Sequence, residues 1–242
     1  MAKSNTKKVE LKTVLSEIFK SSDTTINNSI VSGAGKINKQ KFHILGTQEE
    51  TFLGVDEAAE MAKHVLDIVE KDDETLPIFL LVDVVGQKLE MRDEWLGMYR
   101  YFSHLLKCLH LARKKGHKII SLVYNQAIGG SFIAFGLMAD RIYALDHSTV
   151  AVMWLEAMAK VTKIDEDHLR EISKTSPVFA PGVENFKLLG GLHEVLKLGD
   201  VSAKVIKTLA EDNLEVDNRA ECAENLGGRK RAFKTIQAVE SL

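Results

Sequence analysis

Glycine turns follow two apolar runs, and turns of this kind can stabilise a negative charge. Residues 122–128 run into Gly129-Gly130-Ser131, and residues 77–85 run into Gly86-Gln87. Glycine lets a backbone approach a ligand closely, and the first N–H groups of a helix are free and carry partial positive charge. Two such turns at the carboxyl ends of parallel strands could aim N–H groups at one oxygen that becomes negative during a reaction. The sequence therefore predicts a backbone oxyanion hole whose candidate catalytic residues are Val85, Gly86, Gly129, Gly130 and Ser131.

The simpler interpretation of these glycines is that they only permit close packing of a strand on a helix. The polar side chains beside the turns also allow two interpretations. Gln87, Asn125 and Gln126 could hydrogen-bond a carboxylate or carbonyl of a ligand, or could satisfy backbone groups of their own loops. Pro181 and Gly182, in a stretch with two prolines, are expected to shape a rigid wall near the site.

The elements that would position these residues alternate between strand and helix. The predicted strands are 29–37, 41–46, 77–85, 118–124, 141–145 and 150–153, and the predicted helices are 55–71, 89–115, 130–139, 165–174 and 183–189. Apolar runs too short for helices indicate buried parallel strands covered by helices on both faces. The recurring extra short strand favours an α/β fold of the β-β-α superhelix type.

The chain divides into three predicted parts. Residues 1–28 read as an amphipathic leader helix followed by a polar Ser/Thr/Asn loop, and residues 29–199 as the α/β domain. Residues 200–242 read as a helical C-terminal extension, with peripheral helices at 203–211 and 219–226. We expect partner contacts in the last third of the chain.

The bulk properties exclude several classes of protein. A formal net charge of −2, with 45% hydrophobic and 27% charged residues, gives no reason to expect a nucleic-acid partner. No apolar stretch follows the polar start, and none reaches membrane-spanning length, so a cytoplasmic protein is expected. Cys108 and Cys222 are far apart, and His104 and His110 are six residues apart on one predicted helix, so neither a disulfide nor a metal site is predicted.

Two further strings make the pattern specific. These are Ala-Met-Ala-Lys-Val-Thr-Lys-Ile at 157–164 and Thr-Ser-Pro-Val-Phe-Ala-Pro-Gly-Val-Glu-Asn at 175–185. Together with the two glycine turns they resemble the gamma subunit of biotin-independent malonate decarboxylase, in the carboxyltransferase branch of the crotonase superfamily. The resemblance spans roughly residues 44–185. The family often has its glycines one position later in the chain. Ser131 therefore stands here at the place of the family's second glycine.

The resemblance implies a crotonase-like fold and a decarboxylase subunit that acts with a paralogous beta subunit. The malonyl group would arrive as a thioester on the CoA-derived prosthetic group of an acyl carrier protein, with a carrier-protein transferase as a further partner. Carbon dioxide would leave, an acetyl thioester would remain, and no cofactor would be bound directly. The resemblance also implies that Lys163 contacts the substrate, although a solvated lysine is the ordinary interpretation.

Three other functions are open at this point. Ser131 could be the nucleophile of a crotonase-fold serine hydrolase, with His147 or His168 as base, although Ile133 stands where a Gly-x-Ser-x-Gly elbow needs glycine. The chain could be a carboxyltransferase subunit that depends on biotin. It could also be a non-catalytic scaffold for a partner that holds the whole site.

Overall fold

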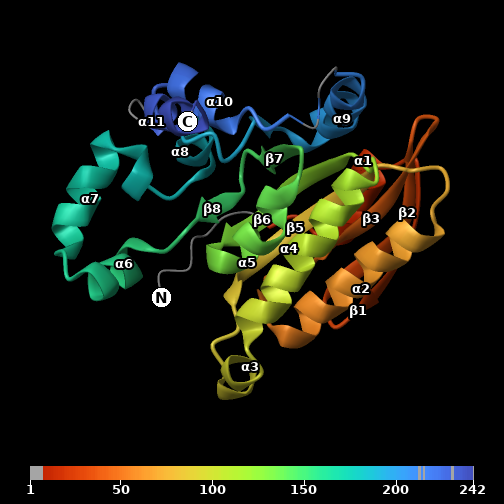
Figure 1. Cartoon of the computed structure of the whole chain (residues 1–242), viewed down its shortest axis with the longest axis horizontal. Helices are drawn as coiled ribbons and strands as arrows, with labels where there is room; N and C mark the ends of the chain where they lie inside the picture. The colour runs from red at the N-terminus through yellow and green to blue at the C-terminus, as the bar shows by residue number, and fades with distance from the viewer. Residues whose placement is uncertain (1–7, 212–213, 215, 230–231, 242) are drawn as a thin grey trace.

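The computed structural model describes residues 8–211, 214, 216–229 and 232–241. Its centre is a sheet whose main path runs β1-β2-β3-β5-β6-β7-β9, with β4 paired to β5 and β8 paired to β6 (Figure 1). The strands are β1 Ser21–Asn27, β2 Ile30–Ile37, β3 Gln40–Thr47, β4 Thr51–Leu53, β5 Ile78–Gln87, β6 Ile119–Ile128, β7 Arg141–Leu145, β8 Thr149–Ala151 and β9 Glu194–Leu196. From β3 onward the pairings are parallel, whereas β1, β2 and β3 form an antiparallel meander.

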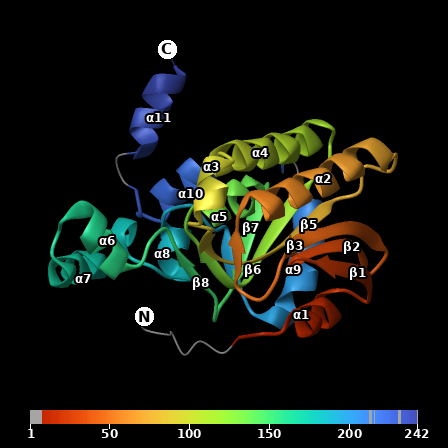
Figure 2. The ribbon, with the colours of Figure 1, turned by 90° about the horizontal axis from the view of Figure 1, so that it is seen from below.

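Helices cover both faces of this sheet. They are α1 Leu11–Ile18, α2 Val55–Lys71, α3 Met91–Trp95, α4 Met98–Lys114, α5 Gly129–Ala134, α6 Leu155–Thr162, α7 Glu166–Thr175, α8 Val183–Leu188, α9 Val201–Leu209, α10 Arg219–Asn225 and α11 Ala232–Glu240, with short 3-10 turns at Gly136–Met138, Pro177–Phe179 and Leu198–Asp200. Seen from below, α2 and α4 lie on one side of the sheet, and α1 and α9 on the other (Figure 2).

The alternation of side chains along β5 explains the two cores. Leu80 and Val82 belong to the core shared with α2 and α4, whereas Phe79 and Leu81 belong to the core shared with α1 and α9. A strand buried on both faces must be apolar at successive positions, which is why the sequence of β5 reads as one continuous apolar run.

Much of the predicted order of elements agrees with the structure. The predicted helix 55–71 is α2, and the predicted strand 141–145 is β7. The predicted helix 89–115 is interrupted, because Leu96 ends α3 and Gly97 adopts a left-handed φ of 74° before α4 begins. Gly116, at φ 94°, follows the end of α4 at the position predicted for a C-cap glycine.

The predicted loop between leader and domain is wrong. Residues 21–27 form β1, which pairs with β2 along its whole length from Ser21 to Asn27. The interpretation failed because β1 is an edge strand that is mostly exposed on both faces, so it carries no apolar alternation. The predicted limit between 28 and 29 therefore falls inside a β-hairpin.

The first helix of the predicted C-terminal extension is also more central than expected. Val201 and Val205 of α9 are fully buried against the sheet, in the core that α1 shares. The predicted helix 203–211 is thus part of the packed domain and not peripheral. Two contacts that the sequence did not predict are β9 with β7 and α6 with α7.

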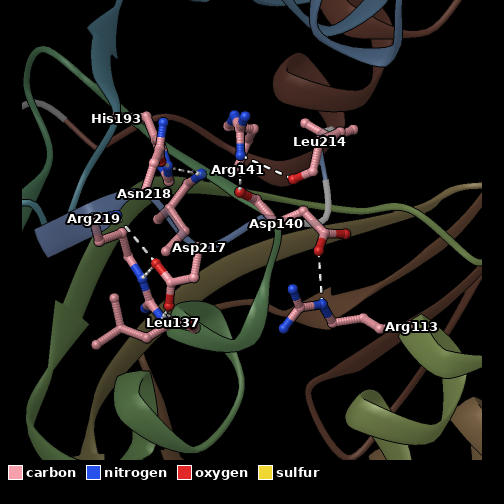
Figure 3. A network of polar contacts seen from close by, with 10 residues as sticks. Arg113, Leu137, Asp140, Arg141, His193, Leu214, Asp217, Asn218 and Arg219 are labelled. Carbon is pink, nitrogen blue, oxygen red and sulfur yellow. Dashed lines mark hydrogen bonds and ion pairs between the residues drawn. The ribbon is translucent and has the colours of Figure 1, made fainter. Parts of the chain in front are cut away.

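A polar network holds the chain that follows α9 against β7 (Figure 3). Arg141 donates to the carbonyls of Asp140 and Leu214 at 2.8 and 3.0 Å, and Asp140 accepts from Arg113 at 2.6 Å. Nearby, Arg219 donates to the Leu137 carbonyl at 3.0 Å and pairs with Asp217. These contacts hold Leu214 and Arg219 against the core.

His193 is the histidine of this network. Its Nδ1 accepts the N–H of Ile142 at 3.1 Å, so its Nε2 carries the proton that faces Asn218 Oδ1 at 3.3 Å. Burial lowers the pKa of His193 below its ordinary 6.5, and Arg141 and Arg219 lower it further, whereas Asn218 and Asp217 raise it. The folded protein therefore holds the neutral form.

We expect His193 to make the protein less stable in acid. The unfolded chain takes up a proton near pH 6.5 but the folded chain does not, so stability present above that pH is lost as the pH falls through the folded pKa. In His193→Asn the carboxamide oxygen can still accept from Ile142 N–H. When urea unfolding is measured between pH 7 and 5, the free energy of unfolding should fall less for this variant than for the wild type. His168→Asn, on the exposed side of α7, is the control and should behave like the wild type. If the free energy of unfolding fell equally with pH in all three proteins, the prediction would be contradicted.

Candidate active site

A bulge at the carboxyl end of β6 sets up the site. Val82 of β5 pairs with Val123, but Val84 pairs with Ala127, so one residue of β5 lies opposite three residues of β6. A bulge bends its strand and redirects the residues that follow it. Here it directs the end of β6, and with it the Gly129-Gly130 turn, toward the end of β5.

The carboxylate of Asp83 fills this bulge. It accepts hydrogen bonds from the N–H of Gln126 at 3.2 Å, the N–H of Glu50 at 3.1 Å and Asn125 Nδ2 at 3.2 Å. Asp83 is only 1% exposed, and burial raises the pKa of its carboxyl group. The three donors offset part of the cost of burying this group.

Two side chains from the turn between β7 and β8 complete the bulge. Ser148 Oγ donates to the Val123 carbonyl at 3.0 Å, and His147 Nε2 donates to the Tyr124 carbonyl at 3.1 Å. The backbone groups that the bulge removes from the strand ladder thus have side-chain partners. Neither this arrangement nor Asp83 was identified from the sequence, because a bulge carries no periodic signal.

The two glycine turns meet in the structure. A methyl group on Gly129 would lie 3.9 Å from the Gly86 Cα and 3.3 Å from Gln87 Oε1, and one on Gly130 would lie 3.5 Å from the same oxygen. A methyl group on Gly86 would meet nothing within 4 Å. Open space therefore borders Gly86, while the Gln87 carboxamide lies against the other turn.

Backbone donors are available on this surface. Gly130 and Ser131 lie in the first turn of α5, where N–H groups have no acceptor within the helix. The β5–β6 ladder ends at Val84 and Ala127, and beyond it Gly86 and Gln87 stay paired with Phe52 and Leu53 of β4 on their other side. Left-handed φ values of 135° at Gly86 and 67° at Gly129 fit glycine. An oxygen of a ligand at the start of α5 could reach the N–H groups of Gly130 and Ser131, and the Gly86-Gln87 turn lies beside them.

Ser131 is not arranged as a nucleophile. Its side chain is 0% exposed, and its hydroxyl donates to the Ile128 carbonyl at 2.8 Å. His147 donates its Nε2 proton to the Tyr124 carbonyl, and His168 lies on the exposed side of α7. The geometry disfavours the hydrolase hypothesis and leaves the N–H of Ser131, not its hydroxyl, as the group that could act.

The polar candidates divide into two groups. Gln87 lies over the glycine turn, as described above. Asn125 exchanges two hydrogen bonds with the backbone of Val9, at 2.9 and 3.0 Å, and Gln126 Nε2 contacts Glu50. The carboxamides of Asn125 and Gln126 are therefore occupied by the protein itself, which is the alternative that the sequence left open.

Pro181 and Gly182 lie beside β8. The N–H of Gly182 donates to the Val150 carbonyl at 2.7 Å, and Asn185 donates to the Pro181 carbonyl at 2.8 Å. Because β8 pairs with the end of β6, this segment lies one strand away from the glycine turn. Lys163 ends α6 with a left-handed φ of 61°, and α6 and α7 project from the body of the protein in both views (Figures 1 and 2).

Exposed apolar side chains follow β5 and β8. Leu89, Met91 and Trp95 come after β5, and Trp95 is 81% exposed; Val152 and Trp154 come after β8. Asp93 holds α3 in place by accepting the N–H of Val55 at 2.7 Å. The sequence placed Trp95 on an apolar helix face, and only the break at Gly97 exposes it.

Comparisons with known proteins show the family to which this chain belongs. Residues 48–242 match the family model described as malonate decarboxylase gamma subunit. The chain is 33% identical over 209 residues to the malonyl-S-ACP:biotin-protein carboxyltransferase MADD of Malonomonas rubra, which covers 78% of this chain and 72% of the relative. The chain belongs to the malonate decarboxylase gamma subunit family.

Solved structures place this gamma-family chain in the carboxyltransferase, crotonase-like fold. It superposes on a chain of the Pseudomonas malonate decarboxylase hetero-tetramer in complex with coenzyme A with a TM-score of 0.81, 19% identity and coverage of 94% and 97%. The Pseudomonas MdcD-MdcE hetero-dimer gives a TM-score of 0.75 at 22% identity, covering 89% and 91%. Transcarboxylase 12S gives 0.69 at 21% identity, covering 83% of this chain and 41% of the other.

The family and the fold predicted from the sequence are thus confirmed for this gamma-family protein. The matched region also runs beyond the resemblance seen in the sequence, which ended near residue 185. Among the described residues, no helix is both long and apolar enough to cross a membrane.

Proposed function

We propose that this chain is the gamma subunit of a malonate decarboxylase and that its two glycine turns hold the thioester oxygen of a malonyl group. The convergence of Gly86 with Gly129 beneath the Gln87 carboxamide supports this proposal most strongly. In the reaction the bond between the α-carbon and the carboxylate breaks, and carbon dioxide leaves. The electron pair moves into the thioester as an enolate, and a proton then adds to the α-carbon to give the acetyl thioester.

This chemistry needs no side-chain nucleophile, which agrees with the buried Ser131 hydroxyl. The negative charge develops on the thioester oxygen, where one N–H of the Gly86-Gln87 turn and the N–H groups of Gly130 and Ser131 would stabilise it. In other enzymes, loss of one such donor raises the barrier by about 3 to 4 kcal/mol. Because the carbonyl oxygen is neutral before the reaction, these donors favour the transition state over the bound substrate.

The remaining candidates surround this centre. Gln87 would hydrogen-bond the malonyl carboxylate or thioester, and Val85 would carry the turn that precedes it. Pro181 and Gly182 would form a wall beside β8. Lys163, at the end of the projecting α6, would meet a phosphate of the prosthetic arm of the carrier protein. The side chains of Asn125 and Gln126 would hold the bulge in place and would not contact the substrate.

The exposed apolar side chains around the site favour a partner that covers them. Large apolar groups gathered on a surface commonly mark an interface. We propose that Trp95 and its neighbours face a paralogous beta subunit, since a gamma-type structure in Pseudomonas occurs as an MdcD-MdcE hetero-dimer. An acyl carrier protein would deliver the malonyl thioester on its CoA-derived arm. We also propose that a transferase loads the carrier protein and that the protein is cytoplasmic.

One observation favours a second function. The Malonomonas relative is a biotin-protein carboxyltransferase, so the carboxyl group in that protein is passed to biotin. The same enolate would form in both reactions, because both remove the carboxyl group from a malonyl thioester. The two functions differ only in whether the carboxyl group leaves as free carbon dioxide or is transferred to biotin.

Reconstitution tests the proposal and separates the two functions. The chain would be purified alone and co-purified with the beta subunit, and carbon dioxide release from malonyl-carrier protein would be measured with and without avidin. We expect almost no release by the chain alone and avidin-resistant release by the complex. Activity that appears only with a biotinylated carrier protein, and that avidin removes, would establish the biotin-dependent function. Full turnover by the chain alone would contradict the need for a partner.

A further inference from the structure

We infer that residues 8–10, directly before α1, are part of the scaffold that positions the Gly129-Gly130 turn, and that Asn125 is the positioning residue that connects the two. The inference rests on the proposed function for its effect on turnover. The structural connection itself runs from Val9 through Asn125 and Asp83 to the bulge in β6. We call the paired hydrogen bonds between Val9 and Asn125 the leader clamp.

The leader clamp joins residues 116 positions apart. The N–H of Val9 donates to Asn125 Oδ1 at 2.9 Å, and Asn125 Nδ2 donates to the Val9 carbonyl at 3.0 Å. A carboxamide that both accepts from and donates to one residue imitates a neighbouring strand, and therefore fixes the orientation of both partners. Asn125 is buried, so loss of the clamp would leave polar atoms without partners.

A second contact runs parallel to the clamp. Lys8 pairs with Glu50 at 2.7 Å, and the same carboxylate contacts Gln126. Glu49 and Glu50 both have left-handed φ values, of 57° and 53°, which are unfavourable for side chains of this type. The N–H of Glu50 bonds to Asp83, so the carboxylate that fills the bulge also holds this loop.

The connection to the glycine turn is short. Asn125 and Gln126 are two of the three bulged residues of β6, and Gln126, Ala127 and Ile128 pair with β8. Gly129 follows directly and begins α5. A change in the position of the bulge is therefore passed along three paired residues to the N–H groups proposed to hold the enolate oxygen.

The leader meets the bulge through few contacts. A cavity of ≈ 870 Å³ lies between residues 8–16, part of β1, the loop around Glu50, and Asp83, Tyr124 and Asn125. The helix α1 is fixed independently, because Val14, Ile18 and the following Phe19 are buried in the core. Cutting the clamp should consequently release the segment around Val9 without detaching α1.

Two variants in the assembled complex test the inference. Asn125→Ala removes the clamp from the β6 side. Val9→Pro removes the N–H of Val9 from the leader side and leaves the Asn125 side chain in place. The control is Asn27→Ala, which removes an exposed hydrogen bond between β1 and Glu60. Amide hydrogen exchange at residues 8–10 and 126–131 would be measured together with kcat and KM for malonyl-carrier protein.

We expect Asn125→Ala to exchange about tenfold faster at Val9, and both clamp variants to exchange about tenfold faster at 126–131. Turnover should fall about tenfold in kcat, with KM within twofold of the wild type, because the substrate still binds but the donors are displaced. Asn27→Ala should change neither measurement. An effect of Asn125→Ala on KM that Val9→Pro does not share would overturn the inference, since it would show that Asn125 contacts the substrate.

Amide exchange tests this inference separately from the proposed function, because exchange is measured without any turnover of substrate. Faster exchange at 8–10 with unchanged exchange at 126–131 would also overturn the inference, whatever the complex catalyses. Coupled exchange of both segments in a complex that releases no carbon dioxide would support the connection and contradict the proposed function.

Discussion

Gly130→Ala should fold normally and lose about a hundredfold in decarboxylation by the assembled complex. The new methyl group would lie 3.5 Å from Gln87 Oε1, which is an ordinary contact, and Gly130 does not have a left-handed φ. Alanine also favours a helix over glycine at this position in α5. The methyl group would instead occupy the space beside the turn where the thioester oxygen is proposed to bind.

The matched control is Gly199→Ala. A methyl group at Gly199 meets nothing within 4 Å, and Gly199 lies in a 3-10 turn between β9 and α9. Both variants should unfold at the urea concentration of the wild type or above it, and only Gly130→Ala should lose turnover. If Gly130→Ala kept full activity in a correctly assembled complex, the enolate oxygen would not bind at this turn, and the scaffold alternative would gain support.

Asp83→Ala is expected to have the largest effect on stability. It leaves the N–H groups of Glu50 and Gln126 and the Asn125 carboxamide without their buried acceptor. Each buried donor without a partner costs about 1 to 3 kcal/mol, so a loss of about 3 kcal/mol or more in the free energy of unfolding follows. Relief from burying a carboxyl group, whose pKa burial raises, offsets part of this loss.

Urea unfolding of the purified chain measures this loss. Asp67→Ala is the control, because Asp67 lies on α2 in an exposed pair with Lys71; such pairs contribute between about 0 and 1 kcal/mol. A partly folded Asp83→Ala protein at low temperature should also show weakened protection of residues 126–131 from amide exchange. Equal stability of the Asp83 and Asp67 variants would contradict the role assigned to Asp83 in the bulge.

The sequence was sufficient to predict the parts of the site that depend on local patterns. Strand β5 is buried on both faces, so it must be continuously apolar, and its end at Gly86 was visible. Gly129 and Gly130 likewise stood between an apolar strand and a helix. Because parallel strands end on the same edge, the meeting of the two turns followed from topology.

The parts that depend on tertiary contacts could not be predicted. The sequence left open whether Asn125 binds a ligand or the backbone, because its partner, Val9, is 116 positions away. The edge strand β1 lacked apolar alternation, and Asp83 had no visible partner until the bulge placed Gln126 beside it. The sequence left open whether the Ser131 hydroxyl is a nucleophile. The hydrogen bond from this hydroxyl to the Ile128 carbonyl disfavours that role, and sequence patterns do not reveal such a bond.

The central claim is that backbone N–H groups from two turns of this chain hold one acyl oxygen. A crystal structure of the complex with a malonyl thioester analogue that cannot lose carbon dioxide tests it most directly. The account predicts an acyl oxygen about 2.7 to 3.1 Å from one backbone nitrogen of the Gly86-Gln87 turn and one of Gly130 or Ser131. An analogue bound with its acyl oxygen held only by the beta subunit, or by side chains away from these glycines, would contradict it.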